Sequence, residues 1–370
     1  MKLYPFKLER YFAKYEFSAK YLLCCSDCDG LLMNEIVDMA DERTVKMWQE
    51  LKLGYTESLG LPLLRQEIAK LYTGISFENI LEVVPEEGVF LALNAILEKD
   101  DHVICMFPGY QSLYEIAQGI GAQVTKWYPD ESQNWRFDPE FLRKSITKKT
   151  KLLIINLPHN PTGFLASKKD FETIMAIARE HNIYVLSDEM YRFLEYDVRD
   201  RLSSACEIYE KAVSLFGMSK TFGMAGVRTG WVVTKDRALY EKMTVFKDYT
   251  TICPSAPSEI LSLIALRNKD EIITRHLKRI HRNLLLLDTF FEKYENRFSW
   301  IRPKAGTIGF PVIKGGVNAT EFCSDVVKHT SILLLPSTMY DYDDTHFRIG
   351  FGRENMPEVL EKLDIYLQKK

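Results

Sequence analysis

Six short runs of apolar residues lie in the first two thirds of the chain, each bounded by polar or turn-forming residues. A strand with one solvent-exposed face alternates apolar and polar residues, and these runs do not. Continuous apolar runs of this length are typical of strands buried on both faces, as in a parallel sheet. The predicted strands span residues 80–84, 102–107, 151–156, 183–187, 212–216 and 230–233.

A helical pattern separates the third and fourth runs. Phe171, Ile174 and Ala178 recur at spacings of three and four residues, and the pattern ends at His181. Strand, helix and strand in this order form a βαβ unit, whose two strands lie parallel. We therefore predict an α/β domain over residues 40–262, with a mostly parallel central sheet and flanking helices.

The last third of the chain has a different pattern. One long helical stretch runs from Ile272 to Tyr294. Shorter strand-like pieces and a final helix follow, at residues 309–313, 332–335, 347–349 and 356–367. This order predicts a smaller α+β domain, formed by residues 263–370 together with residues 1–39.

Composition narrows the classes of function. The 370 residues carry a net charge of −3 and 27% of them are charged, so nothing favours nucleic acid or an anionic membrane as a partner. No apolar run approaches the roughly 18 residues that span a bilayer. Residues 1–7 contain charges and a proline where a signal peptide is apolar. We therefore predict a cytoplasmic protein without nucleic-acid or membrane partners.

Seven cysteines, an odd number, argue against a disulfide framework. Three of them cluster at Cys24, Cys25 and Cys28, which suggests a metal or redox site. No second pair of cysteine or histidine residues follows at ligand spacing, so a zinc site is not completed. We predict no metal, and reduced thiols near a cleft.

The segment Ser214–Trp231 carries the strongest chemical signal. Lys220 lies between two predicted strands, in a stretch too rich in glycine for a stable helix. A solvated loop lysine is one interpretation. The other is a lysine that forms a Schiff base with a carbonyl group, because burial lowers the pKa of the ammonium group and frees its amine.

Ser219-Lys220, followed by the sequence Gly-Val-Arg-Thr-Gly-Trp at Gly226–Trp231, resembles the lysine motif of the class I/II aminotransferases. These are fold-type I enzymes that use pyridoxal 5′-phosphate (PLP), and similar motifs follow in order from about Tyr55 to Arg348. The resemblance implies the PLP-dependent transferase fold, PLP as the cofactor and Lys220 as the residue that holds it as a Schiff base. Lys220 would also act as the general base that takes the α-proton.

The resemblance also assigns the residues around the cofactor ring. Asn160, in an Asn-Pro-Thr-Gly turn, and Tyr191 would both reach the ring oxygen, and Asn160 would also border the substrate. Asp188 ends a predicted strand, where a side chain enters the ligand crevice of a parallel sheet. Its charge would favour the protonated pyridine nitrogen on which electron-sink chemistry depends. The alternatives are a structural turn for Asn160 and a helix cap for Asp188.

A cofactor phosphate needs backbone N–H groups and positive charge. Glu87, Gly88 and Val89 follow the first predicted strand, where a helix N-terminus offers free N–H groups. Acidic side chains there must point away from an anion or be offset by cations. By resemblance, Arg228 and the Ser219 hydroxyl are the further phosphate ligands.

One position departs from the family pattern. Related enzymes often carry a hydroxyl residue three positions before the lysine, and this chain has Gly217 there. We therefore predict a weaker hold on the phosphate, or a water in place of the hydroxyl.

Three more site residues are assigned by resemblance. Tyr110 would stack on the pyridine ring, with a core tyrosine as the alternative. Tyr55 would reach the phosphate of a partner subunit, which implies a homodimer. Arg348 would bind the substrate α-carboxylate, because a guanidinium fork matches both carboxylate oxygens. Arg353 is interpreted as a surface or salt-bridge residue.

The resemblance implies transfer of an amino group between an L-amino acid and a 2-oxo acid. The same core also serves lyases and cyclases. The opening of the chain resembles capreomycidine synthase, which cyclises a hydroxylated arginine, so a PLP-dependent lyase or cyclase is the alternative. A PLP-binding regulator is disfavoured, because the chain has no room for a DNA-binding module and is not basic. No second arginine stands out for a distal carboxylate, which weighs against an aspartate-specific enzyme.

Overall fold

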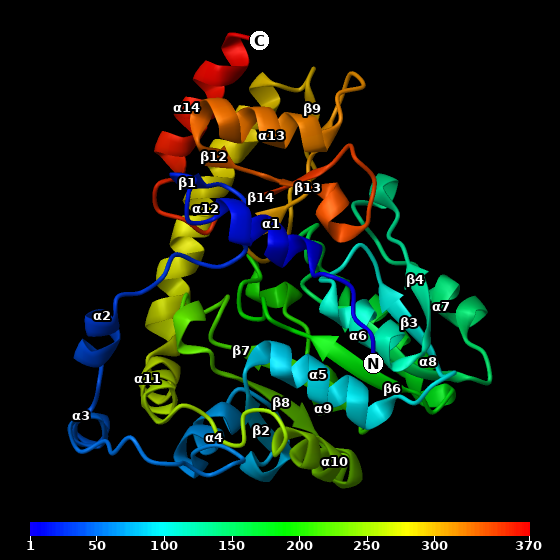
Figure 1. Cartoon of the computed structure of the whole chain (residues 1–370), viewed down its shortest axis with the longest axis vertical. Helices are drawn as coiled ribbons and strands as arrows, with labels where there is room; N and C mark the ends of the chain where they lie inside the picture. The colour runs from blue at the N-terminus through cyan, green and yellow to red at the C-terminus, as the bar shows by residue number, and fades with distance from the viewer.

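A computed structural model of the chain describes residues 1–370, and its largest sheet has seven strands and lies in the lower half of the view in Figure 1. The strand order is β2-β8-β7-β6-β5-β3-β4, and only β8 runs antiparallel to its neighbours. The fold is therefore α/β with a mostly parallel sheet, as predicted. The strands are β2 (Ile80–Val83), β3 (His102–Met106), β4 (Gln123–Trp127), β5 (Thr150–Asn156), β6 (Tyr184–Asp188), β7 (Ala212–Gly217) and β8 (Gly230–Thr234).

The edge strand β4 is the one strand of this sheet that the apolar pattern did not predict. Its residues include Gln123, Thr125 and Lys126, and only Trp127 at its end is fully buried. An edge strand has one free side and tolerates polar residues there. The continuous apolar run that marks a central strand is therefore missing from β4.

Both faces of the sheet are buried, because successive side chains point to opposite sides. Along β3, Val103 and Cys105 pack with one set of helices, whereas Ile104 and Met106 pack with another set. The first face is covered by α5 (Pro85–Ile96), α6 (Ser112–Ile120) and α10 (Arg237–Lys247). The second face is covered by α4 (Pro62–Ala69), α7 (Pro139–Ser145), α8 (Lys168–Glu180), α9 (Ala205–Ile208) and α11 (Ala256–Arg267).

The two ends of the chain come together in a second, smaller part. The long helix α12 (Lys269–Lys293) runs along one side of the molecule toward this part (Figure 1). Strand β1 (Tyr21–Leu22) pairs in parallel with β12 (Ile332–Leu333), so the N-terminal segment joins the C-terminal elements. The other C-terminal elements are β9 (Phe298–Ser299), β10 (Ile308–Gly309), β11 (Val312–Ile313), α13 (Ala319–Thr330), β13 (Leu335–Pro336), β14 (Phe347–Gly350) and α14 (Met356–Gln368).

The N-terminal helices divide between the two parts. Helix α1 (Lys7–Tyr15) lies between the sheet and the C-terminal elements (Figure 1). Ile36 of α2 (Met33–Asp38) packs in the core on the second face of the sheet, and α3 (Glu42–Gln49) follows. No helix combines the length and the apolar character needed to cross a bilayer. Short 3-10 helices complete the chain at Phe77–Asn79, Glu131–Gln133, Val198–Asp200, Ala225–Val227 and Ser337–Tyr340.

Residues 23–31, here called the N-terminal strip, pass directly over the end of β14. The Gly350 N–H donates to the Leu23 carbonyl over 2.7 Å, and the Cys28 N–H donates to the Lys220 carbonyl over 3.3 Å. A Cβ atom on Gly350 would lie 1.9 Å from the Cys25 carbonyl oxygen. Only glycine permits this approach, so the C-terminal strand is shaped to receive the strip.

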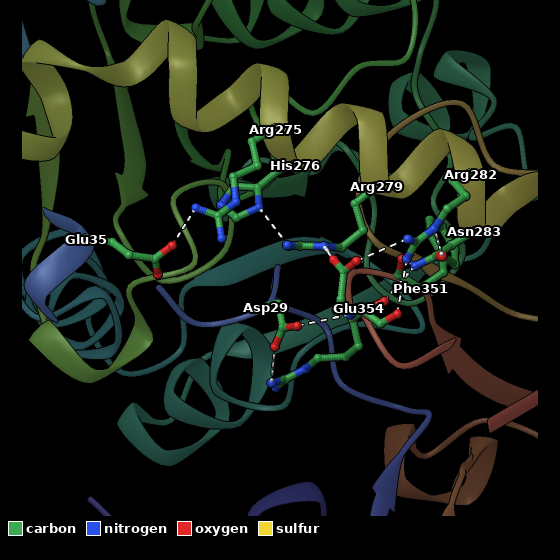
Figure 2. A network of polar contacts seen from close by, with 10 residues as sticks. Asp29, Glu35, Arg275, His276, Arg279, Arg282, Asn283, Phe351 and Glu354 are labelled. Carbon is green, nitrogen blue, oxygen red and sulfur yellow. Dashed lines mark hydrogen bonds and ion pairs between the residues drawn. The ribbon is translucent and has the colours of Figure 1, made fainter. Parts of the chain in front are cut away.

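A polar network fixes the strip to α12 (Figure 2). Arg279 and Arg282 converge on Glu354, with N–O distances of 2.5 and 3.1 Å. The backbone N–H of Glu354 in turn donates to Asp29 of the strip over 3.0 Å. Arg353 is paired with the strip as well, 3.4 Å from Asp29. The strip thus has a defined position relative to both parts of the molecule.

Candidate active site

A cavity of about 420 Å³ lies where the carboxyl ends of the sheet strands face α1 and the N-terminal strip. Nine of the predicted site residues line it: Val89, Tyr110, Asn160, Asp188, Tyr191, Ser219, Lys220, Arg228 and Arg348. Three others do not: Tyr55, Glu87 and Gly88. Strand ends of a parallel sheet are where α/β proteins bind ligands.

Asp188 is the last residue of β6, so its side chain leaves the sheet into the cavity. Its carboxylate accepts the Met190 N–H over 3.1 Å, and burial raises its pKa to about 6. Asn156, on the neighbouring strand β5, donates to the Asp188 carbonyl over 3.1 Å. The same Asn156 accepts the Asn160 N–H over 2.7 Å. One side chain therefore fixes the backbone of both Asp188 and Asn160.

Lys220 stands in the loop after β7, and its Nζ donates to the Ser26 hydroxyl over 2.9 Å. Burial lowers the pKa of Lys220, and the positive charge of Arg348 lowers it further, while Asp27 acts in the opposite direction. Ser26 was not predicted as a site residue. Ser26 reaches the cavity because the N-terminal strip packs closely on Gly350. No local sequence motif predicts that packing.

Two buried polar groups in the cavity lack a partner in the protein that a ligand could supply. The hydroxyl of Tyr191, a residue only 2% exposed, has no hydrogen-bond partner in the protein. The guanidinium of Arg348, a residue 1% exposed, has no carboxylate partner; its neighbours are oxygen atoms of uncharged groups. A buried cation without a counter-ion favours binding of an anion.

Arg348 belongs to β14 and is held in one orientation. Its Nε donates to the Cys24 carbonyl over 2.9 Å, and its Nη1 donates to the Tyr340 hydroxyl over 2.5 Å. The Tyr340 hydroxyl donates onward to the Asn160 side chain over 3.0 Å. Tyr340 is a second site residue that the sequence did not reveal. Arg353, by contrast, is paired with Asp27 over 3.0 Å and is a salt-bridge residue.

The start of α5 shows which of its side chains face the phosphate end of the cavity. Pro85, Glu86 and Val89 line the cavity, whereas the Glu87 side chain turns away and lies 3.8 Å from the Lys247 ammonium group. Gly88 also faces away, and its Cα packs on the sheet. With 3.6 residues per turn, positions 85, 86 and 89 share one side of a helix and positions 87 and 88 another.

Glu86 is therefore the acidic residue that points into the cavity. Burial raises the pKa of its carboxyl to about 7, so the group is readily protonated near neutral pH. Arg228 lines the same end and adopts a left-handed backbone conformation with φ of 55°. The position of Gly217 has no space for a hydroxyl side chain, because a Cβ there would lie 2.8 Å from the Cα of Gly230.

Helix α1 contributes side chains that the sequence did not predict. Leu8, Glu9, Phe12 and Glu16 line the cavity. The Tyr110 hydroxyl donates to Glu9 over 2.7 Å, so the predicted stacking residue is anchored to this helix. A signal was present in the sequence, because Glu9, Phe12 and Glu16 follow the three- and four-residue spacing of one helical face.

The remaining predictions concern Tyr55, the cysteines and a metal site. Tyr55 is 92% exposed on the surface, and its predicted contact with a partner subunit stays a prediction. All seven cysteines are free thiols, and Cys25 lines the cavity. No three His, Cys, Asp or Glu side chains lie together in a way that could hold a metal ion.

The residues present fit PLP. A buried carboxylate, a lysine and an unpartnered tyrosine hydroxyl line the same cavity, and a helix start with Arg228 offers donors for a phosphate. A mostly parallel seven-stranded sheet with this site at its strand ends defines a fold-type I PLP enzyme.

Residues 19–363 match the family described as Aminotransferase class I and II, and the chain belongs to that family. A solved PLP-dependent aminotransferase from Streptococcus suis is similar with a TM-score of 0.93 and 31% identity, covering 100% of this chain and 99% of that chain. Aromatic-amino-acid aminotransferase 2 of Thermococcus litoralis is 28% identical over 337 residues, 85% of this chain and 84% of that protein. Capreomycidine synthase of Streptomyces vinaceus is 24% identical over 266 residues, 72% of this chain and 68% of that protein.

These similarities confirm the predicted family, fold class and type of enzyme. The chain is an aminotransferase, an enzyme that moves an amino group between an amino acid and a 2-oxo acid.

Proposed function

We propose that the cavity performs PLP-dependent transamination of an L-amino acid, with Lys220, Asp188 and Tyr191 as the catalytic residues. The observation that carries this proposal is the placement of three buried groups in one cavity. Lys220 has a lowered pKa, Asp188 has a raised pKa, and Arg348 has no counter-ion of its own. Each is a poor structural residue in that state, and each suits one part of an amino acid bound to PLP.

PLP supplies an electron sink, which stabilises negative charge at the substrate α-carbon while its ring nitrogen is protonated. Asp188 would provide the negative charge beside that nitrogen. A buried carboxyl with only one N–H donor gains most from a cationic neighbour, because the neighbour restores its ionised form. Asn160 and Tyr191 would donate hydrogen bonds to the ring oxygen, and Tyr110 would cover the ring face.

Lys220 would hold the cofactor covalently and, once displaced by substrate, would move the α-proton. A lowered pKa keeps the amine of Lys220 free to accept that proton near neutral pH. The hydrogen bond to Ser26 holds Nζ at the strip, on the substrate side of the cavity. Ser219, Arg228 and Val89 would bind the phosphate.

Arg348 would bind the substrate α-carboxylate. Contacts to the Cys24 carbonyl and the Tyr340 hydroxyl fix its guanidinium before substrate arrives, which lowers the entropy cost of binding. Asn160 lies next to the same guanidinium, 3.4 Å away, so it would border both cofactor and substrate.

The assembly and location are proposed on separate grounds. The exposed side chains of Leu53, Tyr55 and Tyr249, each at least 85% exposed, support a homodimer in which Tyr55 reaches the partner's site. Seven unpaired cysteines support a cytoplasmic location. The separate cores of the sheet and of the C-terminal elements support two domains near the predicted bounds of 40–262 and 1–39 with 263–370, with Ile36 and Ile272 packing in the sheet core.

Spectroscopy and product analysis of the PLP-loaded protein test the proposed reaction. We expect a visible absorption band from the lysine-bound cofactor, loss of that band on adding the amino-acid substrate, and release of a 2-oxo acid. A cyclised or eliminated product with no oxo acid would instead establish the lyase or cyclase alternative. Absence of the band would overturn the assignment of Lys220.

A further inference from the structure

One face of α1 brings two carboxylates and an aromatic ring to the substrate side of the cavity. Glu9, Phe12 and Glu16 follow one another at intervals of three and four residues, and all three line the cavity. The spacing places them in a row along the helix, with the phenyl ring between the two carboxylates.

This row of side chains has a defined position. Backbone and side-chain contacts tie α1 to both parts of the molecule. The Lys7 N–H donates to the Gln111 side chain over 2.8 Å at the sheet side, and the Tyr11 hydroxyl donates to the Leu334 carbonyl over 2.9 Å at the other. The Tyr110 hydroxyl holds the Glu9 carboxylate itself over 2.7 Å.

Acidic residues outnumber basic residues around the cavity. Five acidic residues line it, and only three basic ones do: Glu9, Glu16, Asp27, Glu86 and Asp188 against Lys220, Arg228 and Arg348. Asp27 is compensated from outside by Arg353 at 3.0 Å. The three lining cations are those that the proposed reaction uses for cofactor and α-carboxylate.

Glu9 and Glu16 are left without a cationic partner. No ammonium or guanidinium group of the chain lies within ion-pair distance of either carboxylate, and the only donor to Glu9 is the neutral Tyr110 hydroxyl. The pKa of Glu16 is raised by burial and by the negative charges of Asp27 and Glu9. The protein therefore holds negative charge together in a half-buried place, which is unfavourable until a cation arrives.

The position of Arg348 relates this negative charge to a bound amino acid. Its guanidinium, the proposed anchor of the α-carboxylate, lies 5.9 Å from the centre of the Phe12 ring. The unpartnered Tyr191 hydroxyl, in a residue 2% exposed, marks the same cavity independently as a place for a ligand. A substrate held by Arg348 therefore lies beside the Glu9–Phe12–Glu16 face.

We propose that the enzyme takes an amino acid with a cationic side chain, an ammonium or a guanidinium group, and binds that group at Glu9 and Glu16 over the Phe12 ring. Two carboxylates and an aromatic face provide the contacts that such a cation makes in proteins. A distal carboxylate on the substrate would meet like charge, with no spare cation to receive it. The inference rests on the proposed aminotransferase function and adds its substrate class.

Titration of the PLP-loaded protein with matched amino-acid pairs tests the inference. The readout is the change in the visible band of the lysine-bound cofactor, which reports binding apart from turnover. L-Arginine is compared with L-citrulline, which has nearly the same shape and no charge, and L-lysine is compared with L-norleucine. We expect the cationic member of at least one pair to bind about 10- to 100-fold more tightly, the range for a hydrogen bond to a charged group.

Variants localise the effect. Glu16→Gln keeps the shape of a side chain that has no partner in the protein, so the fold is preserved while the charge is lost. We expect it to reduce the preference for arginine over citrulline by about tenfold, and Glu9→Gln to reduce it in the same direction. Glu42→Gln, at an exposed residue far from the cavity lining, changes net charge equally and is the control.

The outcomes separate the two proposals. A normal cofactor band with equal binding of charged and neutral partners, or with tighter binding of L-glutamate, L-aspartate or L-phenylalanine, overturns the inference alone. A preference that Glu16→Gln and Glu9→Gln leave intact overturns the assignment to α1. A protein that forms no band overturns the proposed function, and this inference with it.

Discussion

Asp188 ends a strand in the middle of the sheet and Lys220 follows another, whereas Glu9 stands on the nine-residue helix α1 and Glu16 caps its end, with no strand to support them. The first pair is set by backbone ladders that the whole fold depends on. A helix as short as α1 is not stable by itself, and side-chain contacts such as that of Tyr110 hold it in place. The catalytic residues are therefore held by the rigid sheet. The residues proposed to select the substrate lie on α1, whose sequence can change without altering the sheet.

Removal of Lys220 should have the largest effect among the site residues that the sheet places. Lys220→Ala cannot hold the cofactor covalently or move the α-proton, so we expect a loss of turnover of at least about 10⁴-fold. The visible band of the lysine-bound cofactor disappears as well. Lys242→Ala, at an exposed position, is the control and should keep both band and rate. Full turnover by Lys220→Ala would contradict the assignment.

Loss of the Asp188 charge should have the next largest effect. Asp188→Asn keeps the size of the side chain but removes the negative charge beside the ring nitrogen. We expect turnover to fall by about 10²- to 10³-fold, as for other preorganised charges in active sites. Single-turnover kinetics check this, and an unchanged rate would show that ring protonation does not depend on Asp188.

The same variant has a measurable pH signature. Burial raises the pKa of Asp188 from 3.8 to about 6, so the folded, cofactor-free protein binds this proton more tightly than the unfolded chain does. Stability from this group is present below about pH 4 and is lost as pH rises to about 6. We expect the Tm of the wild type to fall relative to Asp188→Asn over that interval. Parallel Tm curves would contradict it.

A smaller effect is expected at the contact between Gly350 and the N-terminal strip. Gly350→Ala would place a Cβ atom 1.9 Å from the Cys25 carbonyl oxygen, so the N-terminal strip must move. We expect a loss of about 1–3 kcal/mol in the free energy of unfolding, as for other overpacked sites, together with weaker substrate binding. Gly54→Ala, whose Cβ meets nothing within 4 Å, is the matched control in thermal unfolding. Equal Tm values for the two variants would argue against a role for Gly350 in receiving the strip.

The smallest effect concerns the carboxylate anchor. Tyr340→Phe removes the hydroxyl that joins Arg348 to Asn160. One lost hydrogen bond corresponds to a rise in KM for the amino acid of about 3- to 10-fold, with a smaller change in kcat. Tyr342→Phe removes a nearby hydroxyl that bonds to neither residue and serves for comparison. A purely lowered kcat would place Tyr340 in the chemical step instead.

Sequence reasoning succeeded where the information is local. The central strands have continuous apolar runs, and the motifs around Asn160, Asp188 and Lys220 lie at the ends of those strands. The fold and the catalytic side of the cavity could therefore be predicted together. Strand β4 was missed because an edge strand does not need the apolar run. The helical rotation that turns Glu86 into the cavity and Glu87 out of it depends on packing against the sheet, which a linear pattern does not fix.

The substrate side depended on contacts between distant residues. Tyr110 meets Glu9 across 101 positions of the chain, and Arg348 meets the Cys24 carbonyl across 324. No single segment carries a signal for such contacts. Ser26 and Tyr340 were missed for this reason, and the regular spacing of Glu9, Phe12 and Glu16 becomes meaningful only once α1 is placed beside the cavity.

The path of the N-terminal strip also sets the order in which the enzyme can be completed on the ribosome. Leu23 and Cys24 leave the ribosome long before their partners Gly350 and Arg348, which are made more than 320 positions later. At about 5–20 residues per second, the 324 positions between Cys24 and Arg348 correspond to about 15–65 s of synthesis. During that time the nascent chain has its sheet but no finished site, so activity begins only after the C-terminal strand is released.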